Sequence, residues 1–263
     1  MRLSTKWIWI TGASSGIGRA LAVECARRDA NLVLLARNEA GLQETKSLCT
    51  GKGEKVIQQM DLESNTSMEE AANILLSRHI PIDILINNGG ISQRSFALDT
   101  TEATGRRIFD INYFGTIYFT KLLLPEMIKN GHGHIAVTTS LVGHIGSPKR
   151  TTYAASKHAL HGYFDSLRAE LFDSNIKVTL MCPGFIRTNI SLSAVTGDGT
   201  QQNMMDEKTG NGMDPARLAV KAINGIEREK EEIYIGGVEI LAIYLKRFVP
   251  GIFSKILRKA KVT

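Results

Sequence analysis

The sequence predicts one α/β domain, built as a doubly wound parallel sheet of seven strands with helices on both faces. Short apolar runs alternate with amphipathic segments along the chain, and this alternation is typical of a parallel sheet covered by helices. No internal repeat, low-complexity stretch or linker interrupts it. With 263 residues, 43% of them hydrophobic, the chain is long enough to bury a sizeable core.

The expected elements follow in order from the apolar runs and from the glycines, prolines and polar residues between them. Pro183 ends the sixth strand, where proline is tolerated because no further ladder donor is needed. The expected strands are 7–10, 32–36, 55–60, 82–86, 134–139, 177–181 and 232–235. The expected helices are 18–28, 39–49, 65–78, 102–129, 152–172 and 215–228, with residues 1–237 as the main body and 238–263 as a C-terminal extension of the same domain.

Composition argues against several classes of function. The net charge is +6, but the last 28 residues hold six basic residues and one acid, so the body is nearly balanced and no nucleic-acid partner is expected. No apolar run reaches the roughly 18 residues of a membrane span, and no signal peptide is evident. Three cysteines, an odd number, predict reduced thiols in a cytoplasmic protein. No ligand spacing indicates a metal, and His158 and His161 are expected to form a pair on a helix surface.

A glycine-rich turn directly follows the first strand. Gly12, Gly16 and Gly18 allow a tight turn in which backbone amides can approach a pyrophosphate. The helix that begins there presents its positive end to the same anion. Because the strand and the helix flank the glycines in the right order, the turn predicts dinucleotide binding.

A tyrosine and a lysine four residues apart, Tyr153 and Lys157, fall on one face of an expected helix. A free tyrosine titrates near pH 10, so it exchanges protons poorly at neutral pH. Lowering its pKa by about three units requires about 4 kcal/mol. An ammonium group about 4 Å away could supply this in a partly shielded site. The pair therefore predicts an acid–base group, and an ordinary surface pair is the alternative for this spacing taken alone.

Several motifs in order resemble those of the short-chain dehydrogenase/reductase family. They are the Gly-x-x-x-Gly-x-Gly turn, Asn87-Asn88-Gly89-Gly90, Asn112, Ser140, the Tyr153/Lys157 pair and Pro183-Gly184. The resemblance covers about residues 5–235, and the run 87–95 is similar to that of the single-domain member-7 type, although Gly89 stands where alanine is commoner. It implies a Rossmann-type fold, an oxidoreductase activity and a homodimer or homotetramer.

The resemblance also implies that NADP(H) is the cofactor. An acid at the end of the second strand would hold a ribose 2′-hydroxyl, but that strand ends at Arg37 and Asn38, with no acid before Glu39. Arg37 can pair with a 2′-phosphate, and the alternative is a solvated arginine at a helix entrance. The cofactor-binding residues implied are Gly12, Ser14, Ser15, Gly16, Ile17, Gly18, Arg37, Asn38, Asp61, Leu62, Asn88, Gly89, Tyr153, Lys157, Pro183, Gly184, Ile186 and Thr188.

The same resemblance assigns the chemistry, the interconversion of a secondary alcohol and a ketone or aldehyde. Ser140 would bind the substrate oxygen, and Tyr153 would exchange a proton with it. Lys157 would lower the tyrosine pKa and hold the nicotinamide ribose, and Asn112 would hold a water that links the lysine to solvent. The segment 191–213 is expected to be a mobile substrate lid, with surface disorder as the alternative. Substrate contacts are expected from Ser140, Leu141, Val142, Tyr153 and Phe185.

The C-terminal extension combines apolar and basic residues, and Pro250 is expected to divide it into two short helices. Its apolar face suits either the surface of an anionic membrane or packing against the body or a second subunit. The expected protein is a cytoplasmic enzyme acting on a small carbonyl or alcohol, with a peripheral membrane contact left open. The rivals are a non-catalytic NADP(H)-binding sensor and a membrane-recruited interaction protein.

Overall fold

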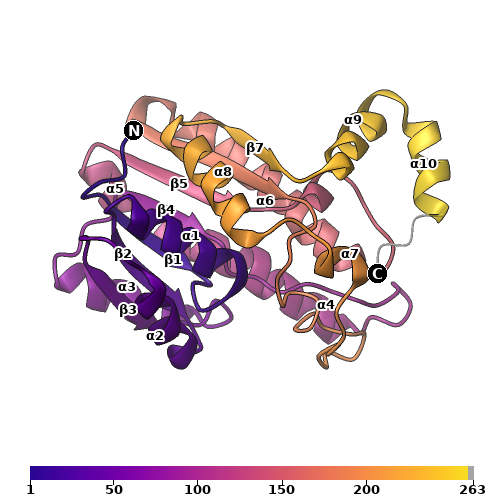
Figure 1. Ribbon diagram of the computed structural model, residues 1–263, viewed down its shortest axis with the longest axis horizontal. Coiled ribbons are helices and arrows are strands. Elements are labelled where there is room, and N and C mark those ends of the chain that lie inside the picture. Colours follow the sequence, from indigo (N-terminus) through magenta and orange to yellow (C-terminus); the bar gives the residue numbers. More distant parts are fainter. Residues whose placement is uncertain (260–263) are drawn as a thin grey trace.

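The computed structural model describes residues 1–259 and contains a seven-stranded parallel sheet (Figure 1). The strands are β1 (Trp7–Thr11), β2 (Asn31–Ala36), β3 (Lys55–Gln59), β4 (Ile84–Asn87), β5 (Gly133–Thr138), β6 (Ile176–Pro183) and β7 (Glu232–Ile235). Their spatial order is β3-β2-β1-β4-β5-β6-β7. The chain reverses its direction across the sheet between β1 and β4, which is where open α/β sheets bind ligands. The predicted fold class and all seven strands are confirmed.

Helices connect the strands in the order that the sequence predicts. They are α1 (Gly16–Arg27), α2 (Glu39–Leu48), α3 (Asn65–Ser77), α4 (Glu102–Phe109), α5 (Thr116–Lys129), α6 (Thr151–Glu170), α7 (Glu207–Gly210), α8 (Pro215–Glu227), α9 (Leu241–Phe248) and α10 (Pro250–Lys259). Polar side chains cap several of them: Ser64 accepts from the third residue of α3, and Asp214 stands before Pro215 at the start of α8.

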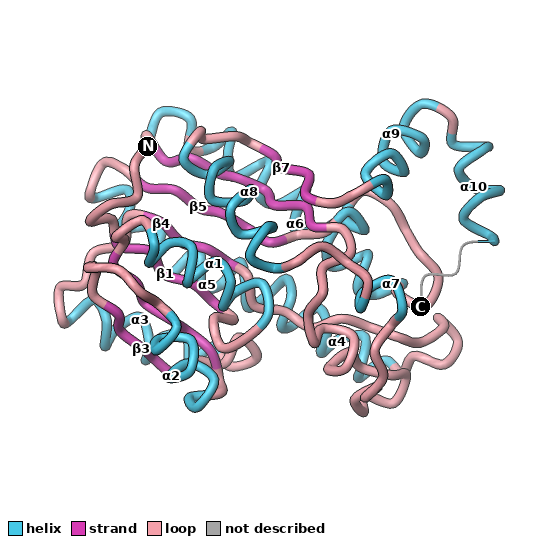
Figure 2. The backbone as a smooth tube through the Cα atoms, in the orientation of Figure 1, coloured by secondary structure: helices cyan, strands magenta, loops and turns pink. Residues whose placement is uncertain are grey.

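Alternate residues of each strand pack on opposite faces of the sheet. On one face, Ile8 and Ile10 of β1 belong to a core formed with α1, α2 and α8, whereas Trp9 belongs to a core formed with α3, α5 and α6. Figure 2 shows the strands between these helices. Because the central strands are buried on both faces, their sequences are short apolar runs without strict alternation.

The helix predicted over residues 102–129 is interrupted, which the sequence did not indicate. A π-helical turn, Asp110–Gly115, separates α4 from α5. Such turns insert one residue into an α-helix and are frequent at functional sites. Here the turn carries Asn112, whose side chain is fully buried and bonds to the segment after β4. The tertiary contact, not local propensity, explains the interruption.

The segment 191–213 is ordered, contrary to the alternative of surface disorder. Val195 accepts a hydrogen bond from the backbone of Arg94 at 2.8 Å and donates one to Ser92 at 2.9 Å. Ser191 and Ala194 are fully buried, and the segment ends with the short helix α7. Several of its residues line the main cleft, so it covers that cleft as a lid would. Its movement stays a prediction.

The C-terminal extension forms two helices at the end of the molecule remote from β3 (Figure 1). The break falls at Pro250, as predicted. Ile240 and Ile243 pack against the body, whereas Leu241 and Phe248 are exposed. The extension thus packs through one side and leaves apolar side chains in solvent on the other.

Within residues 1–259, the helices are too short or too polar to cross a bilayer. The peripheral membrane contact, the cytoplasmic location and the oligomeric state stay predictions. Lys261, one of the basic residues on which the membrane expectation depends, lies outside the described residues.

A buried histidine should make the fold sensitive to acid. Burial, with the nearby N-terminus and Lys177, lowers the pKa of His134 from its ordinary 6.5 to about 4. The unfolded chain therefore binds a proton more readily than the folded chain, and stability falls as the pH drops from 6.5 towards 4. When the pH falls from about 7 to about 5, protonation linked to His134 should lower the unfolding free energy of the wild type by up to about 2 kcal/mol. His134→Gln should not suffer this loss.

This difference is measured by urea unfolding at the two pH values. His158→Gln is the control, because it makes the same substitution at an exposed histidine of α6. An unchanged acid dependence in His134→Gln would contradict the assignment.

Candidate active site

The turn between β1 and α1 is shaped to receive an anion. Gly12 has a φ of +66°, in the left-handed region that favours glycine. Ser15 is the N-cap of α1, and its side chain makes no capping hydrogen bond. The first N–H groups of α1 thus lack a side-chain acceptor there, at the positive end of the helix. Ser15, Gly16 and Ile17 line the main cleft, so a bound phosphate would meet these donors.

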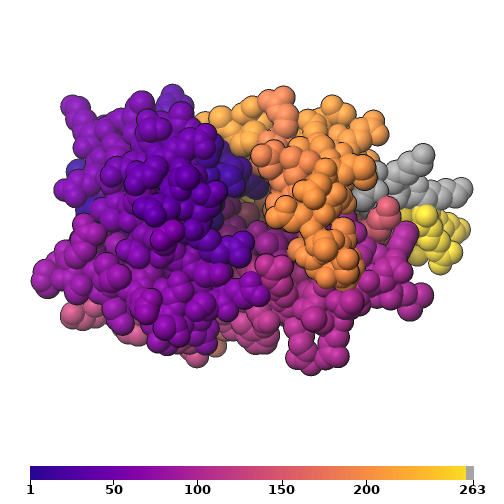
Figure 3. Space-filling model, turned by 90° about the horizontal axis from the view of Figure 1, so that it is seen from below, coloured from indigo at the N-terminus to yellow at the C-terminus, as the bar shows by residue number. Residues whose placement is uncertain are grey.

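The main cleft, of about 420 Å³, extends from this turn to Tyr153. Figure 3 shows a recess between the N-terminal part, in indigo, and the orange segment that includes residues near 200. All of the predicted cofactor residues line the cleft except Gly18. Gly18 packs instead beneath the turn, where an added Cβ would lie 2.2 Å from the Gly12 carbonyl oxygen. Gly18 allows this close packing and does not line the cleft.

The end of β2 presents an accessible cation to the cleft. The Arg37 side chain is 55% exposed, and its Nη1 lies 3.9 Å from Asp61 Oδ2. Asn38 caps α2, because its Oδ1 accepts from the Gly41 N–H at 3.0 Å. Arg19 pairs with Glu44 and donates to the Ser14 carbonyl at 2.7 Å, so it braces the glycine turn.

Lys157 carries its ammonium group into the interior. Its side chain is buried, and Nζ donates to the Thr138 carbonyl oxygen at the end of β5, at 2.9 Å. Burial lowers the pKa of Lys157 to about 8. Nζ lies 5.8 Å from the centroid of the Tyr153 ring. The lysine is therefore close to the phenol without being bonded to it.

The Tyr153 phenol stays protonated at neutral pH. Burial raises its pKa above 10, and the charges of Arg150 and Arg94 and a hydrogen bond with Ser140 only partly oppose this. The charges that oppose the effect of burial belong to the two arginines, and the expectation that Lys157 lowers the tyrosine pKa stays a prediction. Sequence reasoning missed them as site residues, although Arg150 directly precedes α6 and Arg94 lies in the run 87–95.

Asn112 acts on the backbone of the segment after β4. Its Oδ1 accepts from the Ile91 N–H at 2.8 Å, and its Nδ2 donates to the Ile91 carbonyl at 2.9 Å and to Ser156 Oγ at 3.1 Å. The side chain does not itself line the cleft. It joins the π turn, the β4 segment and α6, and so holds the elements on which the site is built.

Gln93 is a second positioning residue, and the sequence analysis overlooked it. It is fully buried, and its Oε1 accepts from the backbone N–H groups of Thr152 at 2.9 Å and Tyr153 at 3.1 Å. This caps the start of α6, where the N-cap residue Arg150 makes no side-chain cap bond. The capping contact orients the turn of helix that bears the phenol.

Two of the residues predicted to contact the substrate do not line the cleft in this structure. Leu141 and Val142 are buried and lie outside the set of residues lining the cleft. Ser140 Oγ accepts from the Val142 N–H at 3.3 Å and starts a 3-10 turn, Leu141–Gly143, which directs the chain into the core. Ser140, Tyr153 and Phe185 do line the cleft.

A buried ion pair anchors the segment over the cleft. Arg94 and Asp206 have side chains 3% and 1% exposed, and Arg94 Nε donates to Asp206 Oδ2 at 2.8 Å. Burial would raise the pKa of Asp206, but hydrogen bonds from Arg94 hold it below its usual range. Arg150 also reaches the same oxygen at 3.5 Å. The pair therefore ties the segment to the arginines beside Tyr153.

Known proteins share this fold and sequence pattern. A family model for short chain dehydrogenases matches residues 6–198. The chain is 43% identical over 258 residues to the dehydrogenase/reductase SDR family member 7B of Xenopus tropicalis, covering 94% of this chain and 83% of that protein.

Two solved structures show the same fold. One is a short-chain dehydrogenase/reductase from Burkholderia phymatum in complex with NAD, which is 21% identical and has a TM-score of 0.84. The match covers 100% of this chain and 98% of that one. The other is a short-chain dehydrogenase from Burkholderia cenocepacia J2315 in complex with NADP, which is 22% identical and has a TM-score of 0.80. The match covers 98% of this chain and 99% of that one.

The chain therefore belongs to the short-chain dehydrogenase family, a family of oxidoreductases that bind a nicotinamide cofactor. Within it, the chain is similar to the member-7 group, as the run 87–95 predicted. The two structural neighbours carry different cofactors, so a choice between NAD and NADP depends on the residues of this chain.

Removing the charge of Asp206 should loosen the segment over the cleft. Asp206→Asn leaves Arg94 buried without its charged partner, and breaking a buried pair in this way costs about 3 kcal/mol of unfolding free energy. Cleavage of the segment by a protease should also accelerate. Urea unfolding and limited proteolysis measure the two effects. The matched control is Asp198→Asn, an exposed acid of the same segment; equal behaviour of the two variants would contradict the anchoring role.

Proposed function

We propose that the chain is an NADP(H)-dependent oxidoreductase that interconverts a secondary alcohol and a ketone or aldehyde. The observation that carries the proposal is the meeting of the Ser140 hydroxyl and the Tyr153 phenol in one cleft with the glycine turn. A ligand held at that turn can reach across the carboxyl ends of β1 and β4 to these two groups. A cleft for nucleotide binding alone would not require them.

The residues present fit a dinucleotide. The uncapped first turn of α1 would hold the pyrophosphate, and Asn88 and Asp61 line the cleft where the adenosine would lie. Lys157 would bind the nicotinamide ribose, and Ile186 and Thr188 would close over the nicotinamide. When bound, the nicotinamide supplies or accepts the hydride.

The chain's own groups manage the proton. In the reductive direction, Ser140 holds the carbonyl oxygen, and the protonated Tyr153 donates to it as the alkoxide develops. The charges of Arg150 and Arg94 stabilise the phenolate that remains. Lys157 then has a route to return a proton, because an ammonium with a pKa of about 8 exchanges readily near neutral pH. The reverse sequence applies to oxidation.

The cofactor choice is argued from the end of β2. NADP(H) carries a 2′-phosphate, for which an exposed guanidinium at Arg37 and the N-terminus of α2 are complementary. The strand ends without the acid that would favour a free 2′-hydroxyl. The rival function, a cofactor-binding sensor without turnover, is favoured by no feature of the site, which retains Ser140, Tyr153 and Lys157.

Removing the phenolic hydroxyl should stop turnover but not cofactor binding. Tyr153→Phe should lower the rate of NADPH oxidation by at least about 100-fold, the usual contribution of general acid catalysis. The dissociation constant for NADPH, measured by fluorescence titration, should change less than about twofold. The assay uses a panel of ketones and aldehydes, and Tyr163→Phe, on the same helix, is the control. Retained turnover in Tyr153→Phe would refute the role, and a wild type that binds NADPH but reduces none of the panel would favour the sensor.

Removing the cation at Arg37 should change the cofactor preference. A charge-assisted hydrogen bond contributes about 1.5–3 kcal/mol, so Arg37→Ala should weaken NADPH binding by about 10–100-fold. NADH binding should change little, because NADH has no 2′-phosphate. Titration with both cofactors measures this, and Arg106→Ala, an exposed arginine paired within α4, is the control. Equal losses for the two cofactors would contradict the assignment.

A further inference from the structure

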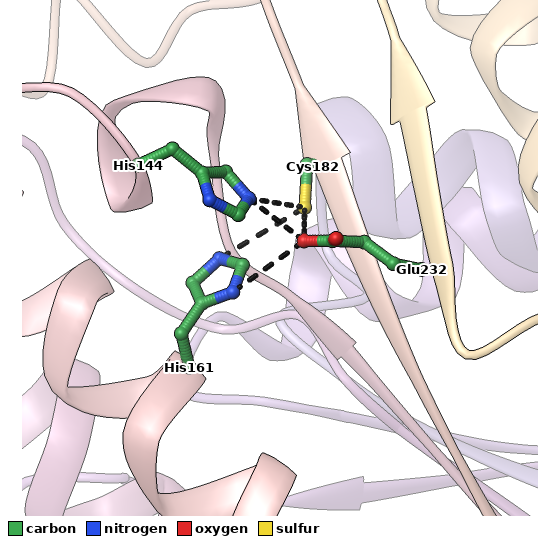
Figure 4. A group of neighbouring side chains, drawn as sticks. All are labelled: His144, His161, Cys182 and Glu232. Atoms are coloured by element: carbon green, nitrogen blue, oxygen red, sulfur yellow. Dashed lines mark hydrogen bonds and ion pairs between the residues drawn. The ribbon is translucent and has the colours of Figure 1, made fainter. Parts of the chain in front are cut away.

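Four side chains of metal-binding type converge on one another (Figure 4). His144 follows the 3-10 turn after β5, His161 lies on α6, Cys182 on β6 and Glu232 at the start of β7. One potential ligand atom from each lies within 4.8 Å of all the others. The interpretation of His161 as a surface residue is wrong, because its side chain is 11% exposed and faces this cluster.

The atoms are spaced for a single small cation. Cys182 Sγ lies 3.8 Å from His144 Nε2, 3.9 Å from His161 Nε2 and 3.3 Å from Glu232 Oε1. Glu232 Oε1 lies 2.7 Å from His144 Nε2 and 3.5 Å from His161 Nδ1. In a tetrahedral zinc site, bond lengths of about 2.0–2.3 Å place the ligand atoms about 3.2–3.8 Å apart. The His144–Glu232 contact would have to lengthen, and His161 would ligate through Nδ1, because its Nε2 lies 3.1 Å from Thr139 Oγ1.

We propose that this cluster is a structural zinc site with two histidines, one cysteine and one glutamate as its ligands. Nitrogen and sulfur ligands together favour Zn²⁺ over the oxygen-preferring cations Mg²⁺ and Ca²⁺. One thiolate and one carboxylate with two neutral imidazoles balance the dication. Four protein ligands leave no open position, which is the arrangement of structural and not of catalytic zinc.

Metal binding requires a deprotonated thiol at Cys182 and neutral imidazoles at His144 and His161, so zinc must displace the thiol proton. The affinity for zinc should therefore increase with pH.

Neighbouring hydrogen bonds already hold the ligands in place. Tyr234 Oη donates to Glu232 Oε2 at 2.7 Å, which leaves Oε1 directed at the cluster. Thr139 Oγ1 lies 3.1 Å from His161 Nε2, so a hydrogen bond there would orient the ring with Nδ1 towards Glu232. Lys246 of α9 donates to the carbonyl oxygen of His144 at 2.6 Å. Such outer hydrogen bonds are a regular feature of metal sites because they orient the ligands.

The site would brace the catalytic elements without touching the substrate. Cys182 directly precedes Pro183, whose carbonyl oxygen accepts from Ser140 Oγ at 3.2 Å. His161 lies one helical turn after Lys157 on α6. A zinc ion would thus cross-link the loop after β5, α6, β6 and β7 directly behind Ser140. The alternative for the same contacts is a metal-free hydrogen-bonded network centred on Glu232.

The test measures metal binding and not turnover, so its outcome is independent of the proposed enzyme activity. The full chain, without a histidine tag, is freed of metal with a chelator, and Zn²⁺ alone is returned. We expect one tightly bound zinc per chain by elemental analysis and a rise in Tm of about 5 °C or more at saturating zinc. The affinity, measured by competition with a chelating dye, should rise about tenfold per pH unit below the pKa of the thiol.

Variants locate the site. Cys182→Ser and Glu232→Gln should each weaken zinc binding by at least about tenfold. With Co²⁺ in place of zinc, the thiolate-to-metal absorption band should be present in the wild type and absent in Cys182→Ser. Cys49→Ser, which alters a buried thiol outside the cluster, is the matched control and should bind zinc as the wild type does. Circular dichroism and NADPH binding establish that each variant is folded.

Two results would overturn the proposal. One is a wild-type protein that retains less than about half an equivalent of zinc after dialysis and shows no shift of Tm. The other is zinc binding that is equally tight in Cys182→Ser, or a cobalt complex without the thiolate band, either of which would place the metal elsewhere. If a variant does not fold, the zinc stoichiometry and the cobalt spectrum of the wild-type protein still decide between the two outcomes.

Discussion

Lys157 places an ammonium group where only 4% of the residue is exposed, and the rest of the site depends on how that charge is accommodated. A buried charge is costly unless it is hydrogen-bonded. The Thr138 carbonyl, at the last residue of β5, provides the acceptor. This requires α6 to cross the end of the strand, and it places Tyr153, one turn earlier, beside Ser140, two residues beyond Thr138. One lysine contact therefore sets the distance between the two groups that would bind the reacting oxygen.

The parallel sheet brings Ser140, Tyr153 and Lys157 to one edge, and irregular features of the chain hold the segments around them in place. Parallel strands bring all their carboxyl ends to one edge of the sheet, where the glycine turn and the Ser140 turn lie together. The π turn at Asn112, the cap from Gln93 and the Arg94–Asp206 pair all join this edge to segments far away in the sequence. Departures from regular geometry are concentrated at functional sites because those sites must satisfy polar groups that a simple core would exclude.

The same loops have two sides. The turn after β5 and the end of β6 present Ser140 and Pro183 to the cleft, and the same two segments present His144 and Cys182 to the cluster behind it. The elements that carry the phenol and the lysine are thus held by the core on one face and by polar contacts on the other. Rigidity behind a site of this kind is needed because small displacements of reacting groups are costly to catalysis.

The sequence by itself determined the fold class, the positions of the seven strands along the chain and many of the residues that line the cleft. These features depend on local periodicity and on short motifs such as the glycine turn. It also determined which residue types would meet at Tyr153 and Lys157. Only the tertiary structure decided that Leu141 and Val142 turn into the core, that Gly18 packs beneath the turn, and that Arg150 and Arg94 act on the phenol. The cluster of His144, His161, Cys182 and Glu232 was decided in the same way, because its members come from four elements up to 88 residues apart. Contacts at such separations depend on how the strands are ordered in the sheet, and no local pattern in the sequence records them.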